Sequence, residues 1–362
     1  MSVDHQKKWQ EYKDKELKKL GPIFDKLGFA LDREQVHIGG ERYVSGDKKL
    51  VLLGKRINDN KKVVIKVSSD REMIAEIKAE YNGRKILEKI NFAYYIFLYP
   101  EEILFVETEG YTIFVTEFIE QNKRFIDRPL KEQFFLALKS FEAQEAIQAT
   151  TYEHAGLIKE HFGFFDAHNY LQKFDKYSRD ILTVSENETK LNELLSQARK
   201  FLVGNKKIID LYSGFLVHWD FVPHNLRIAD NEIYLLDHSS LRFGNKYESW
   251  ARFINFMALY NPELESVLLG YVKQNRGEKE LLSLRLMRVF RLSELIWYYT
   301  KSLEIASGDL LELNKKRIDL WTNVLSAVLS EKQVSFDILE QYRHSRDSLR
   351  DREEKKRQEI LH

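Results

Sequence analysis

The sequence predicts an α+β protein with two unequal lobes, a small antiparallel β lobe carrying one helix and a larger, mainly helical lobe. Three observations support this prediction. Short β-rich runs crowd the first third of the chain, long segments with helical periodicity fill the rest, and one β-rich island at residues 214–237 interrupts the helical part. With 362 residues and 43% hydrophobic content, the chain is long enough to build both lobes.

Composition excludes several classes of protein. The 57 basic residues nearly balance the 56 acidic ones, so no overall field would attract nucleic acid or an anionic membrane surface. The absence of cysteine excludes disulfides and thiolate chemistry and suits a reducing compartment. Residues 1–20 contain no apolar core of a signal peptide, and the most apolar stretch, residues 92–100, is too short to cross a bilayer as a helix. We expect a cytoplasmic protein without nucleic-acid or membrane partners, and the sequence carries no signal for an oligomeric state.

The N-terminal part divides into a helical extension, residues 1–31, and a β lobe, residues 32–119. Helical spacing of apolar residues in the extension is interrupted by Gly21-Pro22, which predicts two short helices. In the β lobe, strands are predicted around residues 42–45, 49–53, 63–67, 103–106 and 111–119, with a helix over residues 71–90. The predicted order is therefore a three-stranded antiparallel meander, a helix and two further strands.

Residues 120–340 are expected to form the helical lobe, and residues 341–362 a charged terminal helix or tail. Long helices are predicted at residues 130–149, 167–181, 188–202 and 281–305, and short strands in the β-rich island at 215–218, 226–228 and 233–236. Charges of alternating sign in residues 343–359 favour a solvated helix or frayed tail, with a binding arm as the alternative.

Polar residues suited to phosphoryl transfer gather in the β-rich island. Residues 218–225 have the form H-x-D-x-x-x-x-N, and a short strand follows that ends at Asp237. Phosphoryl transfer needs a group that accepts the hydroxyl proton and oxygen ligands that hold magnesium on the phosphates. Asp220 is the candidate base, and Asn225 and Asp237 are candidate magnesium ligands, because this ion takes a few oxygen ligands beside water and phosphate. His218 is interpreted as a structural histidine bonded to backbone. Asp220 and Asn225 alone could be ordinary turn residues.

This motif resembles the catalytic loop of the aminoglycoside phosphotransferase and choline kinase-like family, relatives of the protein kinases, in which it commonly reads H-G-D-x-x-x-x-N. The resemblance covers about residues 36–260 and implies a bilobal protein-kinase-like fold, ATP and Mg²⁺ as cofactors, and a small-molecule hydroxyl as acceptor. It also implies that Lys66, at the end of the run V-V-I-K, pairs with the nucleotide's phosphates. Its partner would be Glu80, one helical turn past Ile77, with Glu76 as the alternative.

Other parts of the resemblance are less complete. Glu117 to Ile119 resemble the hinge, where backbone groups would meet the adenine edge. No G-x-G-x-x-G precedes Lys66, and the candidate phosphate loop contains Ser45 and Gly46. Where the family often carries a second aspartate after the metal-binding one, this sequence has Asn245 and Ser249 in the corresponding stretch, which puts the usual bracing of the catalytic loop in question.

The leading hypothesis is an ATP- and Mg²⁺-dependent phosphotransferase that acts on a hydroxyl of an aminoglycoside-, choline- or sugar-like molecule. A nucleotide-binding scaffold or pseudokinase without transfer activity is the alternative. A protein kinase is disfavoured because neither D-F-G nor A-P-E follows the catalytic loop. An aromatic cluster in the C-terminal helices is interpreted as core, with a box for a cationic or ring-bearing substrate as the other interpretation. Its members are Trp297, Tyr298, Tyr299 and Trp321.

Overall fold

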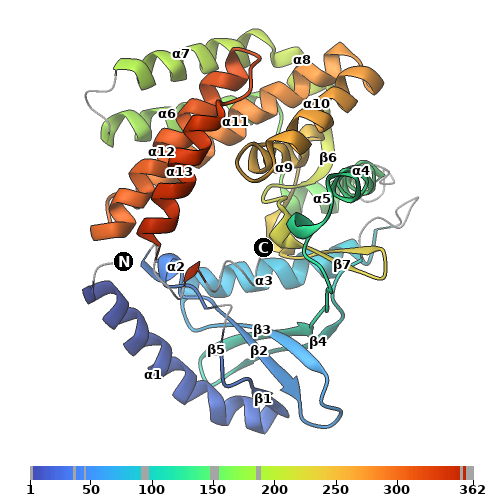
Figure 1. The fold of residues 1–362 in the computed structure, drawn as a ribbon. Coiled ribbons are helices and arrows are strands. Elements are labelled where there is room, and N and C mark those ends of the chain that lie inside the picture. The colour runs from blue at the N-terminus through green and yellow to red at the C-terminus, as the bar shows by residue number, and fades with distance from the viewer. Residues whose placement is uncertain are drawn as a thin grey trace.

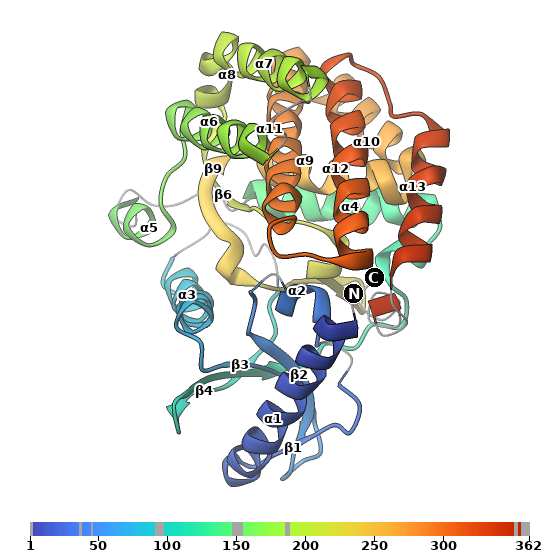
Figure 2. The ribbon, with the colours of Figure 1, turned by 90° about the vertical axis from the view of Figure 1, so that its left-hand side faces the viewer.

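A computed structural model describes residues 3–35, 38–44, 46–90, 98–146, 155–184, 189–350 and 354–355. It confirms the predicted α+β class, with a five-stranded antiparallel sheet in the smaller lobe and helices dominating the larger lobe (Figure 1, Figure 2). None of the helices in these ranges combines the length and apolar character needed to traverse a bilayer.

The small lobe is built on a sheet with the strand order β1-β2-β3-β5-β4, in which all neighbouring strands are antiparallel. Its strands are β1 (Phe29–Leu31), β2 (Leu50–Arg56), β3 (Lys62–Ser68), β4 (Glu102–Thr108) and β5 (Tyr111–Glu117). Helix α1 (Val3–Leu27) packs on one face of the sheet. Helix α3 (Arg71–Leu87) lies between the sheet and the helical lobe (Figure 1).

Alternation along β3 determines which way Lys66 projects. Val63, Ile65 and Val67 are fully buried and belong to the same hydrophobic cluster as Phe24 of α1. Because successive side chains of a strand point to opposite faces, Lys66 projects from the face opposite to α1. That face looks toward α3 and the helical lobe.

The prediction of two short helices in residues 1–31 is wrong. A single helix, α1, continues through Pro22, and the segment ends in strand β1. A proline inside a helix costs roughly 3 kcal/mol. The burial of Leu20, Ile23 and Phe24 beneath the sheet, on both sides of Pro22, offsets this cost.

The prediction of a strand around residues 42–45 is also wrong. Residues 40–44 form a short helix, α2 (Gly40–Val44), and β1 takes the place of the first strand of the meander. Tyr43 of α2 stacks on Tyr12 of α1 with ring centroids 4.9 Å apart, and this tertiary contact is not visible in the local sequence pattern. Ser45 lies outside the described residues.

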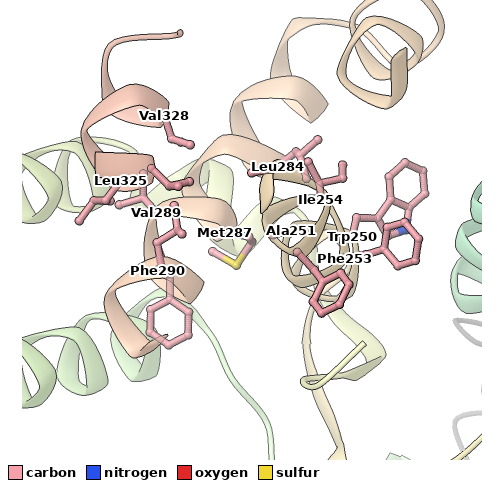
Figure 3. Close-up of a cluster of buried hydrophobic side chains, with 14 of the residues drawn as sticks. Trp250, Ala251, Phe253, Ile254, Leu284, Met287, Val289, Phe290, Leu325 and Val328 are labelled. Atoms are coloured by element: carbon pink, nitrogen blue, oxygen red, sulfur yellow. The ribbon is translucent and has the colours of Figure 1, made fainter. Parts of the chain in front are cut away.

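The helical lobe is organised around α9 (Tyr247–Tyr260), which is buried on nearly all sides. Figure 3 shows α9 residues such as Trp250 and Ile254 in one cluster with Met287 of α11 (Glu278–Ser302) and Leu325 of α12 (Gly308–Leu329). The other helices of this lobe are α4 (Leu130–Ala146), α5 (Ala155–Phe162), α6 (Ala167–Val184), α7 (Thr189–Gly204), α8 (Lys206–Leu211), α10 (Pro262–Asn275) and α13 (Phe336–Leu349). Helices α4, α6, α7 and α11 correspond to the predicted ones.

Two small antiparallel sheets form the β-rich island. Strand β6 (Ser213–His218) pairs with β9 (Leu241–Asn245), and β7 (Leu226–Ala229) pairs with β8 (Glu232–Leu235). The sequence did not indicate β9, whose five residues include a glycine and an asparagine, both unfavourable in strands.

We expect Gly54→Ala in β2 to destabilise the small lobe. A Cβ atom there would lie 2.6 Å from the carbonyl oxygen of Ala30 in β1, so β1 would have to move. The expected loss in the free energy of unfolding is roughly 1–3 kcal/mol, measured by urea or thermal unfolding. Gly270→Ala in α10 is the control, because it lies inside a helix, is not followed by proline, and has nothing beyond its chain neighbours within 4 Å of its Cβ position. It should raise stability by roughly 0.5–1 kcal/mol, and equal effects of the two substitutions would contradict the close approach.

Candidate active site

The β7–β8 hairpin brings Asn225 and Asp237 to the same place. Its turn residues, Asp230 and Asn231, have φ values of 50° and 66°, as the two-residue turns that suit the twist of a hairpin require. At the open end, the amide of Leu236 donates to the carbonyl oxygen of Asn225 at 2.8 Å. The residues that precede and follow the hairpin therefore lie side by side.

Asp220 is held between a guanidinium group and an amide. Arg252 of α9 donates to Asp220 Oδ1 through Nε at 3.1 Å and Nη2 at 2.9 Å. Asn225 Nδ2 donates to Asp220 Oδ2 at 3.0 Å and to its carbonyl oxygen at 2.8 Å. Burial disfavours the charged carboxylate, but the positive charge of Arg252 and the nearby His224 hold the pKa of Asp220 well below its usual range. Asp220 is therefore ionised at neutral pH.

Lys66 lies between two carboxylates that come from different lobes. Its Nζ is 2.5 Å from Glu80 Oε2 in α3 and 3.7 Å from Asp237 Oδ1. Glu76, the alternative partner considered from the sequence, forms an ion pair with Lys49 of β2 instead. Burial raises the pKa of the Asp237 carboxyl. The positive charges of Lys66 and Lys49 outweigh this effect and hold the pKa of Asp237 well below its usual range.

The backbone and side chain of Asp237 are held in an unusual conformation. Its φ and ψ are both 60°, in the left-handed region that only a few non-glycine residues adopt. Ser239 Oγ donates to Oδ1 at 2.8 Å, and Ser240 Oγ donates to Oδ2 at 3.4 Å. Left-handed conformations of this kind persist where the surrounding contacts hold them, and here those contacts also orient the carboxylate.

His218 connects the start of the Asp220 loop to Asp237. Its Nε2 lies 3.1 Å from the carbonyl oxygen of Leu236 and 3.0 Å from that of Asp237. Because carbonyl oxygens only accept hydrogen bonds, Nε2 carries the proton. Burial lowers the pKa of His218 and keeps the ring neutral.

Ser249 braces the loop at the position where a carboxylate was expected. Its Oγ accepts a hydrogen bond from the amide of His218 at 2.9 Å and donates to the carbonyl oxygen of His218 at 3.2 Å. Arg291 Nη2 adds a bond of 2.7 Å to the carbonyl oxygen of Trp219. Asn245 is used elsewhere, since its Nδ2 donates to the carbonyl oxygen of Ile209. The loop is therefore held by a hydroxyl and a guanidinium group.

A cavity of about 170 Å³ lies between the lobes and is called the inter-lobe cavity below. Its polar wall contains Lys66, Glu80, Asn225 and Asp237, and its apolar wall contains Val51, Val64, Phe118 and Ile119. Glu117 also lines it, but the amide groups of Glu117 and Phe118 already donate to backbone carbonyl oxygens at 2.9 and 3.2 Å. A ligand that bonds to this edge would use other backbone groups, such as those of Ile119.

The side of the inter-lobe cavity expected to hold a phosphate loop is lined by side chains. Gly46 has a φ of 93° in the exposed turn after α2, where its amide donates to the carbonyl oxygen of Tyr43. Arg42 and Lys49, on either side of that turn, line the cavity. The role of Gly46 as a phosphate-binding residue stays a prediction.

Sequence reasoning missed Lys49 and Arg252, although signals for both exist. Lys49 and Val51 alternate with the fully or nearly fully buried Leu50 and Leu52, so the argument that locates Lys66 also locates Lys49. Arg252 is a lone basic residue in an otherwise apolar stretch of α9, a position that usually requires a buried or partly buried acidic partner.

A second cavity, of about 210 Å³, adjoins the first and is called the helical-lobe cavity below. Both cavities are lined by Arg42 and His224, and Arg252 also lines the second one. The four aromatic residues singled out in the C-terminal helices do not all lie together. Tyr298, Tyr299 and Trp321 line the helical-lobe cavity. Trp297 instead packs on Tyr177 and donates through Nε1 to Asp180 at 2.8 Å.

The oxygen-bearing residues of the inter-lobe cavity suit a hard divalent ion that is shared with a phosphate ligand. Among the described residues, no three His, Cys, Asp or Glu side chains are grouped to hold a metal without other ligands. Asp237 offers a carboxylate and Asn225 an amide oxygen in the same cavity. Magnesium usually binds proteins through one or two such ligands and keeps water and phosphate oxygens for the rest. The residues present therefore fit Mg²⁺ bound together with a nucleotide.

Comparison with known proteins gives matches at the level of structure. No protein-family model and no curated protein sequence matches the chain. A thermostable variant of aminoglycoside phosphotransferase APH(4)-Ia, in ternary complex with ADP and hygromycin B, matches with a TM-score of 0.55 and 17% identity over 86% of this chain and 97% of that chain.

Two further solved structures give the same result. Macrolide 2'-phosphotransferase type I matches with a TM-score of 0.56 and 13% identity over 83% of this chain and 96% of that chain. ADP-bound aminoglycoside phosphotransferase APH(2'')-Ib matches with a TM-score of 0.52 and 14% identity over 89% of this chain and 97% of that chain. The chain thus has the bilobal, protein-kinase-like fold of the aminoglycoside and macrolide phosphotransferases.

Proposed function

We propose that the protein is a small-molecule kinase that transfers the γ-phosphoryl group of ATP to a hydroxyl group. One observation carries the proposal: charged groups from both lobes meet at one crevice, where Lys66 Nζ lies 3.7 Å from Asp237 Oδ1. Asp220 lies where the two cavities adjoin, because it is bonded to Asn225 of the inter-lobe cavity and to Arg252 of the helical-lobe cavity. The same fold in proteins crystallised with ADP adds support.

The inter-lobe cavity would bind the nucleotide. Its apolar wall suits the adenine ring, and Lys66, oriented by Glu80, would contact the phosphates. Lys49 and Arg42 add positive charge on the same side. Asn225 and Asp237 would hold Mg²⁺, which supplies charge neutralisation on the phosphate oxygens when it is bound.

The helical-lobe cavity would bind the acceptor next to Asp220. The acceptor oxygen forms a bond to the γ-phosphorus, its proton passes to the ionised Asp220, and the bond from phosphorus to the ADP oxygen breaks. Arg252 and Asn225 hold the Asp220 carboxylate in place through three hydrogen bonds of 2.9–3.1 Å. The protein's contribution to such a reaction is mainly positioning and charge stabilisation.

Substitution of the two aspartates should separate catalysis from nucleotide binding. Asp220→Asn should lower phosphoryl transfer by about a hundredfold or more, because the proton acceptor is lost, while ATP affinity stays near the parental value. Asp237→Asn should weaken Mg²⁺-dependent ATP binding by about tenfold, because it removes a charged ligand. Calorimetry measures binding, and ATP consumption measures transfer over a panel of aminoglycosides, macrolides, choline, ethanolamine, homoserine and sugars.

The matched control for this experiment is Asp230→Asn in the β7–β8 turn. Asp230 is exposed and left-handed, and asparagine tolerates that conformation equally well. Asp230→Asn should change neither phosphoryl transfer nor ATP affinity. Transfer by Asp220→Asn at the parental rate would refute the role of Asp220 as base. ATP binding without transfer to any acceptor would favour the alternative of a nucleotide-binding scaffold.

The pH dependence of turnover should depend on Arg252. This guanidinium lowers the pKa of Asp220, so Asp220 stays ionised to an unusually low pH. Arg252→Gln removes the positive charge and raises the pKa of Asp220, so activity should be lost at a higher pH as the solution is acidified. The acid limb of ATP turnover and carbon-13 NMR titration of the Asp220 carboxyl both measure this shift.

Arg199→Gln controls for the loss of a positive charge at a distant, exposed ion pair with Asp175. It should leave the acid limb unchanged. An acid limb that is the same in Arg252→Gln and in the parent would show that Arg252 does not control the ionisation of Asp220.

A further inference from the structure

The walls of the helical-lobe cavity carry an excess of positive charge. Four arginines line it, namely Arg42, Arg252, Arg317 and Arg350. Among the described residues that line the cavity, Glu41 is the sole acidic one. This imbalance contrasts with the nearly neutral chain as a whole, whose formal charge is +1.

Two of the four arginines are neutralised by partners within the protein. Arg252 pairs with Asp220 at 2.9 Å, and Arg317 pairs with Glu41 at 2.9 Å. Arg42 makes a longer contact, 3.9 Å from Asp47. Arg350 forms no ion pair with any residue that the structure describes, so charge neutralisation at the cavity wall is incomplete even when the Asp220 carboxylate is counted.

Arg350 provides an independent sign of a missing partner. It lies at the C-terminal end of α13, and its Nε is buried without a hydrogen-bond partner in the described part of the protein. Buried donors in folded proteins nearly always have an acceptor, and a charged donor loses most when it has none. Arg42 is more exposed, and its nearest acidic contact among the described residues is Asp47, with an N–O distance of 3.9 Å.

The remaining surface of the cavity is aromatic, and its size is limited. Tyr298, Tyr299 and Trp321 form part of the wall. Such faces pack well against rings. The volume of about 210 Å³ is below the range of roughly 300–1,000 Å³ that is usual for ligand pockets, so it suits a compact molecule.

We propose that the acceptor is a compact, hydroxylated ring compound that carries an anionic group, either a carboxylate or a phosphate monoester, which Arg350 and Arg42 bind. This inference rests on the proposed function, because it assigns the charge of the molecule that receives the phosphoryl group. An amine-rich acceptor of the aminoglycoside type would place ammonium groups beside Arg350, which is unpaired among the described residues, and beside the weakly paired Arg42, and like charges in close contact repel. Guanidinium groups, in contrast, bind carboxylates and phosphates through paired hydrogen bonds.

Binding of four sugars that share a ring but differ in charge tests this inference. The probes are glucose, glucosamine, glucuronate and glucose 6-phosphate. The full-length protein is first saturated with Mg²⁺ and a non-hydrolysable ATP analogue, so that anionic probes cannot enter the nucleotide site. Calorimetry should then show glucuronate or glucose 6-phosphate binding about tenfold or more tightly than glucose, and glucosamine binding least, as expected from one charge-assisted hydrogen bond. The two anionic probes distinguish a carboxylate from a phosphate ligand.

Variants of Arg350 locate the site. Arg350→Gln should remove the preference for the anionic probe, and Arg350→Lys should keep part of it because the charge is retained. Lys315→Gln on α12 is the control, since Lys315 is exposed and pairs with Glu312 outside the cavity. It should bind the probes as the parent does. Thermal unfolding checks that all three variants are folded.

The outcomes separate this inference from the proposed function. The anionic acceptor would be overturned if glucosamine bound as tightly as the anionic probes or more tightly, or if the anion preference survived Arg350→Gln. Either result would hold whatever the protein catalyses. Anion-selective binding that depends on Arg350, without phosphate transfer to any hydroxyl, would support the anion site and refute the kinase proposal. Transfer to cationic acceptors at higher kcat/KM than to anionic ones would support the kinase proposal and refute the anionic acceptor.

Discussion

The arrangement of functional groups depends on the position of Lys66 between Glu80 and Asp237. The three residues come from β3, from α3 and from the loop after β8, so one ammonium group connects the sheet, its helix and the helical lobe. The Glu80 side chain is only 5% exposed, and removal of either member of such a pair leaves an uncompensated charge. Because His218 links Asp237 to the loop that carries Asp220, this loop is positioned relative to the sheet through this contact.

The loop itself is braced by a network that differs from the expected carboxylate. Ser249 bonds to both backbone groups of His218, and Arg291, which bonds to the backbone of Trp219, also approaches Glu248 at 3.6 Å. Buried charges are weak evidence for stability, but they restrict the conformations that the attached segments can adopt. The neutral hydroxyl of Ser249 can therefore brace the loop, because the nearby charged groups of Arg291 and Glu248 hold each other in place.

The sequence predicted the features that depend on short-range patterns. The run V-V-I-K, through the family resemblance, indicated Lys66, and helical spacing after Ile77 favoured Glu80 over Glu76 as its partner. Features that depend on packing between distant segments were missed. Pro22 within α1 and the helical conformation around Arg42 are stabilised by contacts with the sheet and with other helices. The cavity that contains Arg350 exists only because α13 packs beside α12, and no local pattern encodes that neighbourhood.

Arg42 lines both cavities, so the two sites share one guanidinium group. A shared cation makes the occupancy of one site change the field in the other, and thermodynamic linkage requires this influence to be mutual. Triphosphate drawn toward Arg42 would reduce the positive potential available to a second anion, and its departure as diphosphate would restore that potential. Under the proposed function, the two ligands would thus be coupled by electrostatics through a single side chain, without a change of fold.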